Sequence, residues 1–356
     1  MSPQPKPSQR ASGSDRPATI RDVAALARVS VATVSRVAHN HPNVQPHLRK
    51  AVEEAIEATR YRLRSSPAGR GRRGLKIGLV IPDITNAYFP LVIRGVCSTA
   101  LVHGAEIILC NADNNSGTEQ KHIERLLEQH ADGVIYIPFL EPIEDPIAGL
   151  LEMGVPIVFL DREHKRERLC AVLSDNEEGA FQAITYLLNL GHRSIVFIAG
   201  PQSYSTTVSR ANGFRRGFHE MGVPYHEEMV IHGDTTYDGA YQATSELLDR
   251  QASFSAIFAS NDMMALGAWK ALEDRGLKVP EDVSIIGYDD VPLSAIMSLT
   301  TIAQPAFEIG RNALTLAVDL IEGRRQAPQR VLLRDSLIIR KSTRGLAANG
   351  PPRHPQ

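Results

Sequence analysis

The chain has 356 residues, of which 43% are hydrophobic, so it has room for two or three domains with buried cores. No apolar run is long enough to span a membrane, and residues 1–17 lack the apolar core of a secretory signal. The net charge of −1 divides into +10 over residues 1–76 and −11 over the rest. These features exclude a membrane-spanning protein, predict a cytoplasmic one with a disordered leader over 1–17, and indicate that the basic head contacts a polyanion.

Residues 18–64 carry the pattern of a helix-turn-helix followed by a third helix. Thr19 and Ser30 are placed to cap the first two helices, and the third helix is expected from about Pro46, since proline suits the first turn. A small three-helix core is predicted from apolar residues at helical spacing, namely Val23, Ala24, Leu26, Ala27, Val34, Val37, Leu48, Val52, Ala55 and Ile56.

The second helix is the predicted DNA-reading element, with Arg36 as the base-contacting residue, because a guanidinium can donate two hydrogen bonds to the guanine edge. Val31 and Ala32 would face outward and touch thymine methyl groups or let the backbone approach. Other residues of the head are expected at phosphates, which position the protein without specifying sequence. The predicted DNA-binding residues of the head are Thr19, Arg21, Ser30, Val31, Ala32, Thr33, Ser35, Arg36 and Asn40.

The motifs Thr19-Ile20-x-Asp22-Val23-Ala24 and Val29-Ser30-x-Ala32-Thr33-Val34-Ser35-Arg36-Val37 resemble the head of the lac-repressor family of bacterial transcription regulators. The resemblance covers about residues 18–343. It implies an α/β protein: a three-helix head on two doubly wound subdomains of the periplasmic-binding-protein type. It also implies a homodimer on a pseudopalindromic operator, controlled by a small-molecule effector.

Residues 65–76 form a predicted Arg/Gly-rich hinge that departs from the family pattern. Relatives place a proline after the tyrosine and a leucine that wedges into the minor groove, but this chain has Leu63 at the proline position and no leucine after Ala68. Pro67 and three glycines disfavour a helix here. An arm that follows a narrow minor groove through Arg70, Arg72 and Arg73, or a plain linker, remain the two alternatives. The glycines also match a dinucleotide fingerprint, but they precede a strand, so no nucleotide cofactor is expected.

Apolar runs alternate with helical segments over residues 77–343, a pattern typical of parallel sheets covered by helices. The expected strands form two consecutive sets: 77–81, 106–110, 133–137, 156–160 and 170–173, then 194–199, 229–232, 256–259 and 283–287. By resemblance the chain crosses between subdomains near 174–176, Gln304 and Arg330. This assigns about 77–174 and 305–330 to subdomain one, 175–304 and 331–343 to subdomain two, and 344–356 to a disordered tail.

Ligands of open α/β sheets bind beyond the carboxyl ends of the strands, where this chain carries polar side chains. Carboxylates, an amide and arginines in one cleft can bind vicinal hydroxyls, and aromatic rings can stack on a sugar. The predicted effector residues are Tyr88, Phe89, Asp161, Arg162, Tyr204, Arg210, Tyr237, Asn261 and Asp289. The ligand class is a sugar or polyol, or a sugar acid if Arg162 joins Arg210. The resemblance assigns effector contact to Asp161, Arg210, Asn261 and Asp289.

Several of these residues have structural alternatives. Asp262, and one of Asp289 and Asp290, are predicted helix caps, and Phe89 could belong to the core. Many relatives carry an aromatic residue after Gly233-Asp234, where this chain has Thr235, so a standard stacking contact is absent from its usual position.

The sequence therefore predicts a DNA-binding transcriptional regulator, most simply a repressor. The alternative is a solute-binding protein of a transporter, which would need a secretory signal and no basic head. Enzyme activity has no support, because no nucleophile–base pattern is present. Cys97, Cys110 and Cys170 are odd in number and lack ligand spacing, so we expect free thiols, no metal and no cofactor.

Overall fold

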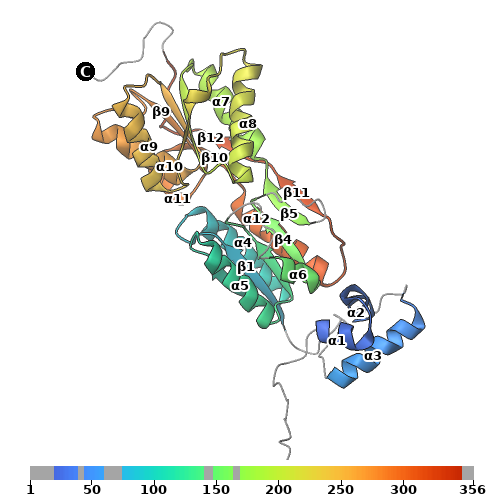
Figure 1. Ribbon diagram of the computed structural model, residues 1–356. Helices are drawn as coiled ribbons and strands as arrows, with labels where there is room; N and C mark the ends of the chain where they lie inside the picture. Colours follow the sequence, from blue (N-terminus) through green and yellow to red (C-terminus); the bar gives the residue numbers. More distant parts are fainter. Residues whose placement is uncertain (1–19, 39–43, 60–73, 140–146, 163–168, 347–356) are drawn as a thin grey trace, which may run out of the picture. The chain divides into compact units, whose positions relative to one another are not determined.

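The structure, a computed structural model, describes residues 20–38, 44–59, 74–139, 147–162 and 169–346. The head and the body, which begins at Gly74, form separate compact units (Figure 1). Within the described residues, no helix is long and apolar enough to cross a membrane.

The head consists of helices α1 (Ile20–Ala27), α2 (Val31–Ala38) and α3 (Pro46–Thr59). The turn between α1 and α2 places Arg28 in the left-handed region with φ 54°. Ser30 then caps α2 as predicted, because its Oγ accepts a hydrogen bond from the Thr33 amide at 3.1 Å. The head core is built from six buried residues: Val23, Ala24, Val34, Val37, Val52 and Ala55.

Two expectations for the head are wrong. Leu26 is 54% exposed and does not contribute to the core, because the inward stripe of α1 is covered by Val23 and Ala24. Val31 is only partly exposed and packs against the core, although an outward position was expected. The short α2 explains this, since its first residue still lies over the turn that joins it to α1.

The body contains two six-stranded sheets. In sheet one all paired strands are parallel and the order is β11-β5-β4-β3-β1-β2. Its strands are β1 (Leu75–Ile81), β2 (Ala105–Asn111), β3 (Gly133–Tyr136), β4 (Ile157–Leu160), β5 (Cys170–Ser174) and β11 (Arg330–Leu333). Its helices are α4 (Tyr88–His103), α5 (Ser116–Glu128), α6 (Ala148–Glu152) and α12 (Ala306–Ile321).

Sheet two has the order β12-β10-β9-β8-β6-β7, and only its edge strand β12 runs antiparallel. Its strands are β6 (Ile195–Ala199), β7 (Val230–His232), β8 (Ala256–Ala259), β9 (Ser284–Asp289), β10 (Thr300–Ala303) and β12 (Ser336–Ile338). Its helices are α7 (Asn176–Asn189), α8 (Ser205–Glu220), α9 (Tyr237–Asp249), α10 (Asp262–Asp274) and α11 (Pro292–Ile296), with a short 3-10 turn at Glu227–Met229.

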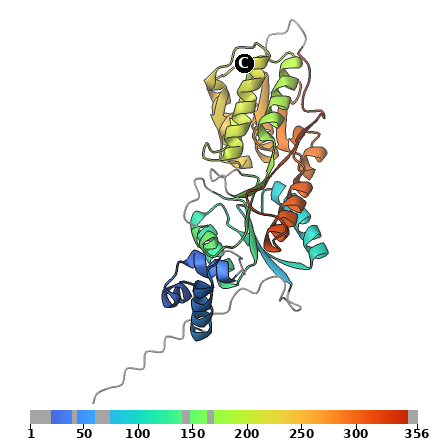
Figure 2. The same ribbon diagram turned by 90° about the vertical axis from the view of Figure 1, so that its right-hand side faces the viewer.

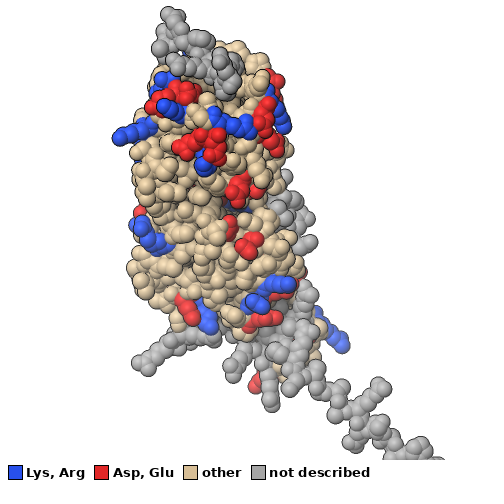
Figure 3. Space-filling model, turned by 90° about the vertical axis from the view of Figure 1, so that its left-hand side faces the viewer, with Lys and Arg blue, Asp and Glu red and all other residues tan. Residues whose placement is uncertain are grey.

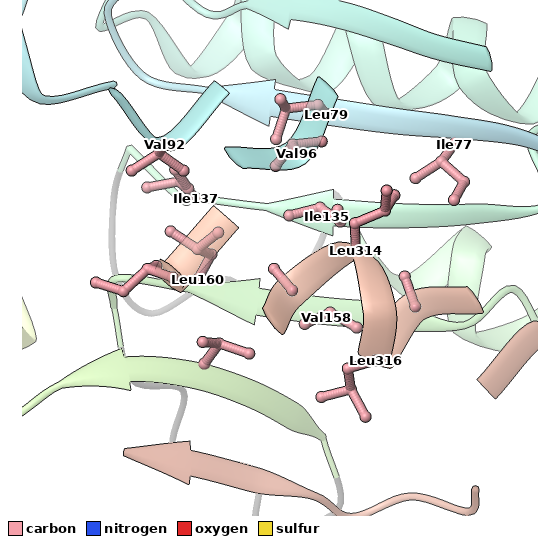
Figure 4. Close-up of a cluster of buried hydrophobic side chains, with 14 of the residues drawn as sticks. Ile77, Leu79, Val92, Val96, Ile135, Ile137, Val158, Leu160, Leu314 and Leu316 are labelled. Atoms are coloured by element: carbon pink, nitrogen blue, oxygen red, sulfur yellow. The ribbon is translucent and has the colours of Figure 1, made fainter. Parts of the chain in front are cut away.

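Each sheet is covered on both faces, as its near-continuous apolar strands require. On one face of sheet one, α4 and α12 bury a cluster that includes Ile77, Leu79, Val96, Val158 and Leu314 (Figure 4). In sheet two, α7 and α8 cover one face and α9 and α10 the other. All nine expected strands are present, with ends that differ by one or two residues. The doubly wound α/β fold is thus confirmed.

The chain crosses between the sheets three times, and these crossings lie side by side (Figures 1 and 2). The first follows Ser174 and the second lies at Gln304, both as expected. The third lies at residues 334–335, because β11 still pairs in parallel with β5 of sheet one. The expected crossing near Arg330 is therefore wrong by about four residues, and residues 331–333 pair with subdomain one. The other domain boundaries stay predictions.

Candidate ligand-binding cleft

A cavity of about 370 Å³ lies in the body at the carboxyl ends of strands from both sheets. The structure brings all nine predicted effector residues to its wall: Tyr88, Phe89, Asp161, Arg162, Tyr204, Arg210, Tyr237, Asn261 and Asp289. These residues span two hundred positions in the chain and meet because parallel strands end at one edge. Their role in ligand binding remains a prediction.

The wall also contains residues that the sequence analysis did not select. They are mostly small polar side chains: Pro82, Asp83, Thr85, Asn86, Asn114, Thr206, Thr207, Thr235, Thr236, Asp238, Ser260, Met263 and Gln304. Asp83 could have been found by the same reasoning, because it follows β1 as Asp161 follows β4. Gln304 was predicted to lie at a crossing between the subdomains, but it was not predicted to line the cleft.

Arg210 is buried, at 6% exposed, and several contacts hold its guanidinium in place. Its Nε donates to Asn176 Oδ1 at 2.8 Å, and its Nη1 donates to the Ser260 carbonyl oxygen. The guanidinium also lies 3.7 Å above the centre of the Tyr288 ring. Each contact fixes the orientation of the guanidinium, so the group that faces the cavity is pre-positioned.

Asp289 lies opposite Arg210, with Oδ1 at 3.9 Å from Nη2. Burial raises the pKa of this carboxyl well above its ordinary value, and the Arg210 cation acts in the opposite direction. Gln304 Nε2 donates to Asp289 Oδ1 at 2.7 Å, and Gln304 Oε1 accepts from Tyr88 Oη at 3.3 Å. A continuous set of polar contacts thus runs from α4 of sheet one to β9 of sheet two.

The helix-cap prediction for Asp289 and Asp290 is wrong. Helix α11 begins after Val291 without a side-chain cap. Asp289 accepts a hydrogen bond from Gln304 Nε2, while Asp290 accepts one from Arg340 Nη2 at 2.6 Å. Both aspartates adopt positive φ angles, 111° and 54°, whereas an N-cap residue normally has extended backbone, as Val291 does here.

Asp161 and Arg162 follow β4 and come from subdomain one. Asp161 adopts a left-handed φ of 66°, which an aspartate tolerates better than most residues. Its carboxylate lines the cavity and makes no hydrogen bond within the described residues. Arg162 donates to the carbonyl oxygens of Pro138 and Phe139, stacks 3.5 Å above the Tyr204 ring, and leaves Nε without a partner among the same residues.

The four aromatic residues differ in burial. Tyr88 and Phe89 are 3% and 5% exposed and belong to the core of sheet one as well as to the wall, so Phe89 is a core residue and its contact with a ligand stays a prediction. Tyr204 is buried beneath Arg162, whereas Tyr237 is half-buried at the start of α9. Thr235, which follows Gly233-Asp234, also lines the cavity.

Asn261, rather than Asp262, caps α10. Its Oδ1 accepts from the Met264 amide at 2.7 Å and its Nδ2 donates to the Thr235 carbonyl at 2.9 Å. Asp262 is fully buried and accepts from Val291, Ser294 and Thr301, which corrects the cap prediction. Burial raises the pKa of Asp262 to about 6. Both positions suit a cap chemically, and the buried hydroxyl partners determine which residue turns inward.

The head residues predicted to bind DNA are less fully described. Ser30 and Thr33 are placed at the start of α2, with their hydroxyl oxygens 2.9 Å apart. For Arg21, Ala32, Ser35 and Arg36 the structure describes the backbone on α1 or α2 and not the side chain. The remaining predicted DNA contacts lie outside the described residues: Thr19, Asn40, Arg70, Arg72 and Arg73.

The cleft combines carboxylate acceptors, guanidinium and amide donors, hydroxyl groups and aromatic faces. That set suits a small polyhydroxylated ligand, whose hydroxyls both donate and accept while its ring carbons pack on an aromatic side chain. Within the described part of the chain, no group of His, Cys, Asp and Glu could hold a metal ion.

Comparison with known proteins is consistent with both parts of the chain. Residues 19–62 match the model of the lacI family of bacterial regulatory proteins, and residues 184–343 match the periplasmic binding protein-like domain. The chain is 35% identical over 302 residues to catabolite control protein A of Priestia megaterium, covering 84% of this chain and 91% of that protein. It is 34% identical over 332 residues to the ribose operon repressor of Halalkalibacterium halodurans, covering 92% and 97%.

Solved structures give the same result. A complex of the transcriptional regulator CelR with cellobiose has a TM-score of 0.70 at 33% identity, covering 91% of this chain and 99% of that one. The lac repressor dimer bound to operator and an anti-inducer has a TM-score of 0.68 at 28% identity, covering 92% and 100%.

The chain therefore belongs to the lacI family of bacterial regulatory proteins. It is a DNA-binding transcriptional repressor, and not a solute-binding protein of a transporter, because the family head precedes the periplasmic-binding-like body. The relatives are regulators rather than enzymes.

Proposed function

We propose that this protein represses transcription as a cytoplasmic homodimer on a pseudopalindromic operator and that a small sugar, polyol or sugar acid in the cleft controls its affinity for DNA. The observation that carries the proposal is the cavity itself. Side chains from both subdomains converge there, with Asp161 and Arg162 on one side and Arg210 and Asp289 on the other. The similarity to a ribose operon repressor and to a regulator solved in complex with cellobiose supports the sugar class.

Control of DNA binding follows from differential affinity. A ligand that contacts both walls binds better when the subdomains are close together than when they are apart, so it shifts the population between the two arrangements. Couplings of this kind amount to about 1–3 kcal/mol. In a two-fold dimer, such a shift changes the spacing of the two heads on adjacent half-sites. DNA affinity then changes without any contact between ligand and DNA.

The proposed dimer surface is the face that carries α4, β2 and α11. Large apolar side chains are exposed there: Leu101 at 84%, Val102 at 82% and Ile296 at 76%, with Leu109 on the open edge of β2 at 41%. Figure 3 shows the side of the molecule that lies at the left of Figure 1, and most of the described surface on this side carries no charged residue. Exposed apolar residues of this size are typical of an interface, and a second copy of the chain is the partner proposed.

For the head, we propose that Arg36 reads a base, that Ser30 and Thr33 contact phosphates at the start of α2, and that Arg70, Arg72 and Arg73 contact the minor groove. The cap at Ser30 supports the proposal for α2, because a helix start directed at DNA favours a phosphate.

The cleft proposal can be tested with a thermal-shift screen of the full chain against ribose, cellobiose, sugar alcohols and sugar acids. A ligand that binds only the folded state raises the melting temperature with concentration. Asp161→Asn should abolish the shift produced by the best ligand, since the Asp161 carboxylate lines the wall and makes no hydrogen bond within the described residues. Asp249→Asn is the matched control, because that carboxylate is 64% exposed on α9 and pairs with Arg275. Equal shifts for both variants would refute the site.

A further inference from the structure

The three crossings between the subdomains each contribute a polar side chain to one buried network. Asn176 belongs to the first crossing, Gln304 to the second and Asp335 to the third. All three are at most 7% exposed. None is needed to complete either sheet, so their polar contacts call for a separate explanation.

Asp335 is the residue in this network that links the two sheets most directly. One carboxylate oxygen accepts a hydrogen bond from Ser174 Oγ, at the end of β5 in sheet one. The other accepts from Tyr288 Oη, on β9 in sheet two. The Asp175 amide also donates to the Leu333 carbonyl at 2.9 Å, which holds the first and third crossings together. Burial raises the pKa of Asp335 to about 6, so the carboxylate is charged at neutral pH.

The same network reaches the cleft through Tyr288. Its ring lies beneath the Arg210 guanidinium, at 3.7 Å from the Cζ atom. Tyr288 can lie against α7 only because residue 179 on that helix is glycine. A Cβ at this position would lie 2.2 Å from the tyrosine hydroxyl oxygen. Arg210 in turn holds Asn176, whose Nδ2 donates to the Ser174 carbonyl at 3.1 Å. The contacts thus close a loop around the crossings.

We propose that Asp335 is a positioning residue that fixes the relative arrangement of the two subdomains by holding Ser174 and Tyr288 together beneath the cleft arginine. A ligand group that draws Arg210 or Asp289 toward itself competes directly with Asn176 and Gln304, which are crossing residues. The hydrogen bonds of the crossing residues therefore change when a ligand occupies the cleft. This inference rests on the proposed effector control, but its test needs neither effector nor DNA, so the two can fail separately.

The test is a distance measurement between spin labels on the two subdomains of the full chain. Labels are attached at Lys121→Cys on α5 and Arg250→Cys after α9, both exposed, in a Cys97→Ser background that removes the exposed thiol. Cys110 and Cys170 are buried. Excess unlabelled chain ensures that each dimer carries at most one labelled copy, so the distances are intramolecular.

Tyr288→Phe removes the hydroxyl and keeps the ring beneath Arg210. We expect it to raise the population of a second distance by at least about tenfold, the effect of losing one hydrogen bond to a charged acceptor. Ser174→Ala should act in the same direction. Tyr186→Phe is the matched control, since its hydroxyl bonds Thr343 at 3.0 Å, away from the crossings, and it should leave the distances unchanged.

Superimposable distance distributions for wild type, Tyr288→Phe and Ser174→Ala would overturn the proposal. An equal change in the Tyr186→Phe control would also overturn it, because the effect would then reflect general loss of stability. If Tyr288→Phe does not fold, Ser174→Ala decides the question, since it removes only one small hydroxyl group, which donates a hydrogen bond to the same Asp335 carboxylate.

Discussion

Replacement of Arg210 by alanine should destabilise the folded protein by an amount that can be estimated from the contacts it removes. The variant loses the hydrogen bonds to Asn176 and Ser260 and the stacking on Tyr288, and it leaves Asp289 buried without its nearest cation. Removing one partner of a buried ion pair costs about 3–5 kcal/mol, because the remaining charge is uncompensated. A protein with a typical stability of about 5–15 kcal/mol would lose a large fraction of it.

Urea unfolding at pH 7.5, followed by fluorescence of Trp269 on α10, measures this loss. Trp269 is the only tryptophan of the chain and lies in the same subdomain. The control is Arg250→Ala, whose side chain is 72% exposed and pairs only with Glu246 within the described residues; its cost should stay below about 0.5 kcal/mol. Arg210→Ala should also abolish the response of DNA binding to a cleft ligand.

The double variant Arg210→Ala/Asp289→Asn tests the electrostatic part of the reasoning. Neutralising Asp289 removes the uncompensated charge, so the double variant should be more stable than Arg210→Ala alone. A cost for Arg210→Ala below about 1 kcal/mol would refute the argument. So would a double variant whose cost is the simple sum of the two single costs.

Three further predictions concern the head, the hinge and the body. Arg36→Ala should weaken binding to a selected operator duplex by about 1–3 kcal/mol and relax its sequence preference, whereas an equal loss on random DNA would contradict base reading. Joint replacement of Arg70, Arg72 and Arg73 by alanine should flatten the salt dependence of DNA binding, and an unchanged slope would favour a plain linker. Burial lowers the pKa of His192 below its ordinary 6.5. The stabilising contribution of the neutral imidazole is therefore present above pH 6.5 and is lost as the pH falls through the folded-state pKa. In His192→Gln, urea unfolding between pH 5 and 8 should show a smaller loss of stability on the acid side.

The sequence predicted the nine principal strands because each is a short apolar run bounded by helical segments. The three strands that it missed have different patterns. β11 alternates between exposed and partly buried residues at the edge of sheet one, and β12 has only three residues. β10 begins with Thr300 and Thr301, which are fully buried but polar. Their hydroxyls bond Thr343 and Asp262, partners that the local sequence does not indicate.

The cleft was predictable for the same reason as the strands, since its residues follow strand ends. The network around the crossings was not, because Ser174, Tyr288 and Asp335 are far apart in the chain and meet only through the third crossing. The helix caps show a further limit. Asn261 and Asp262 are adjacent and chemically suited to the same role, and only burial against Ser294 and Thr301 distinguishes them.

Control of DNA binding by a cleft ligand is tested most directly by the affinity of the full chain for a duplex selected from random sequences, measured with and without the ligand found by the thermal-shift screen. We expect the ligand to change this affinity by about 5- to 150-fold in the wild-type chain, in line with couplings of about 1–3 kcal/mol, and to leave it unchanged in Asp161→Asn. DNA affinity that stays the same when the cleft of the wild-type chain is saturated with ligand would contradict this expectation.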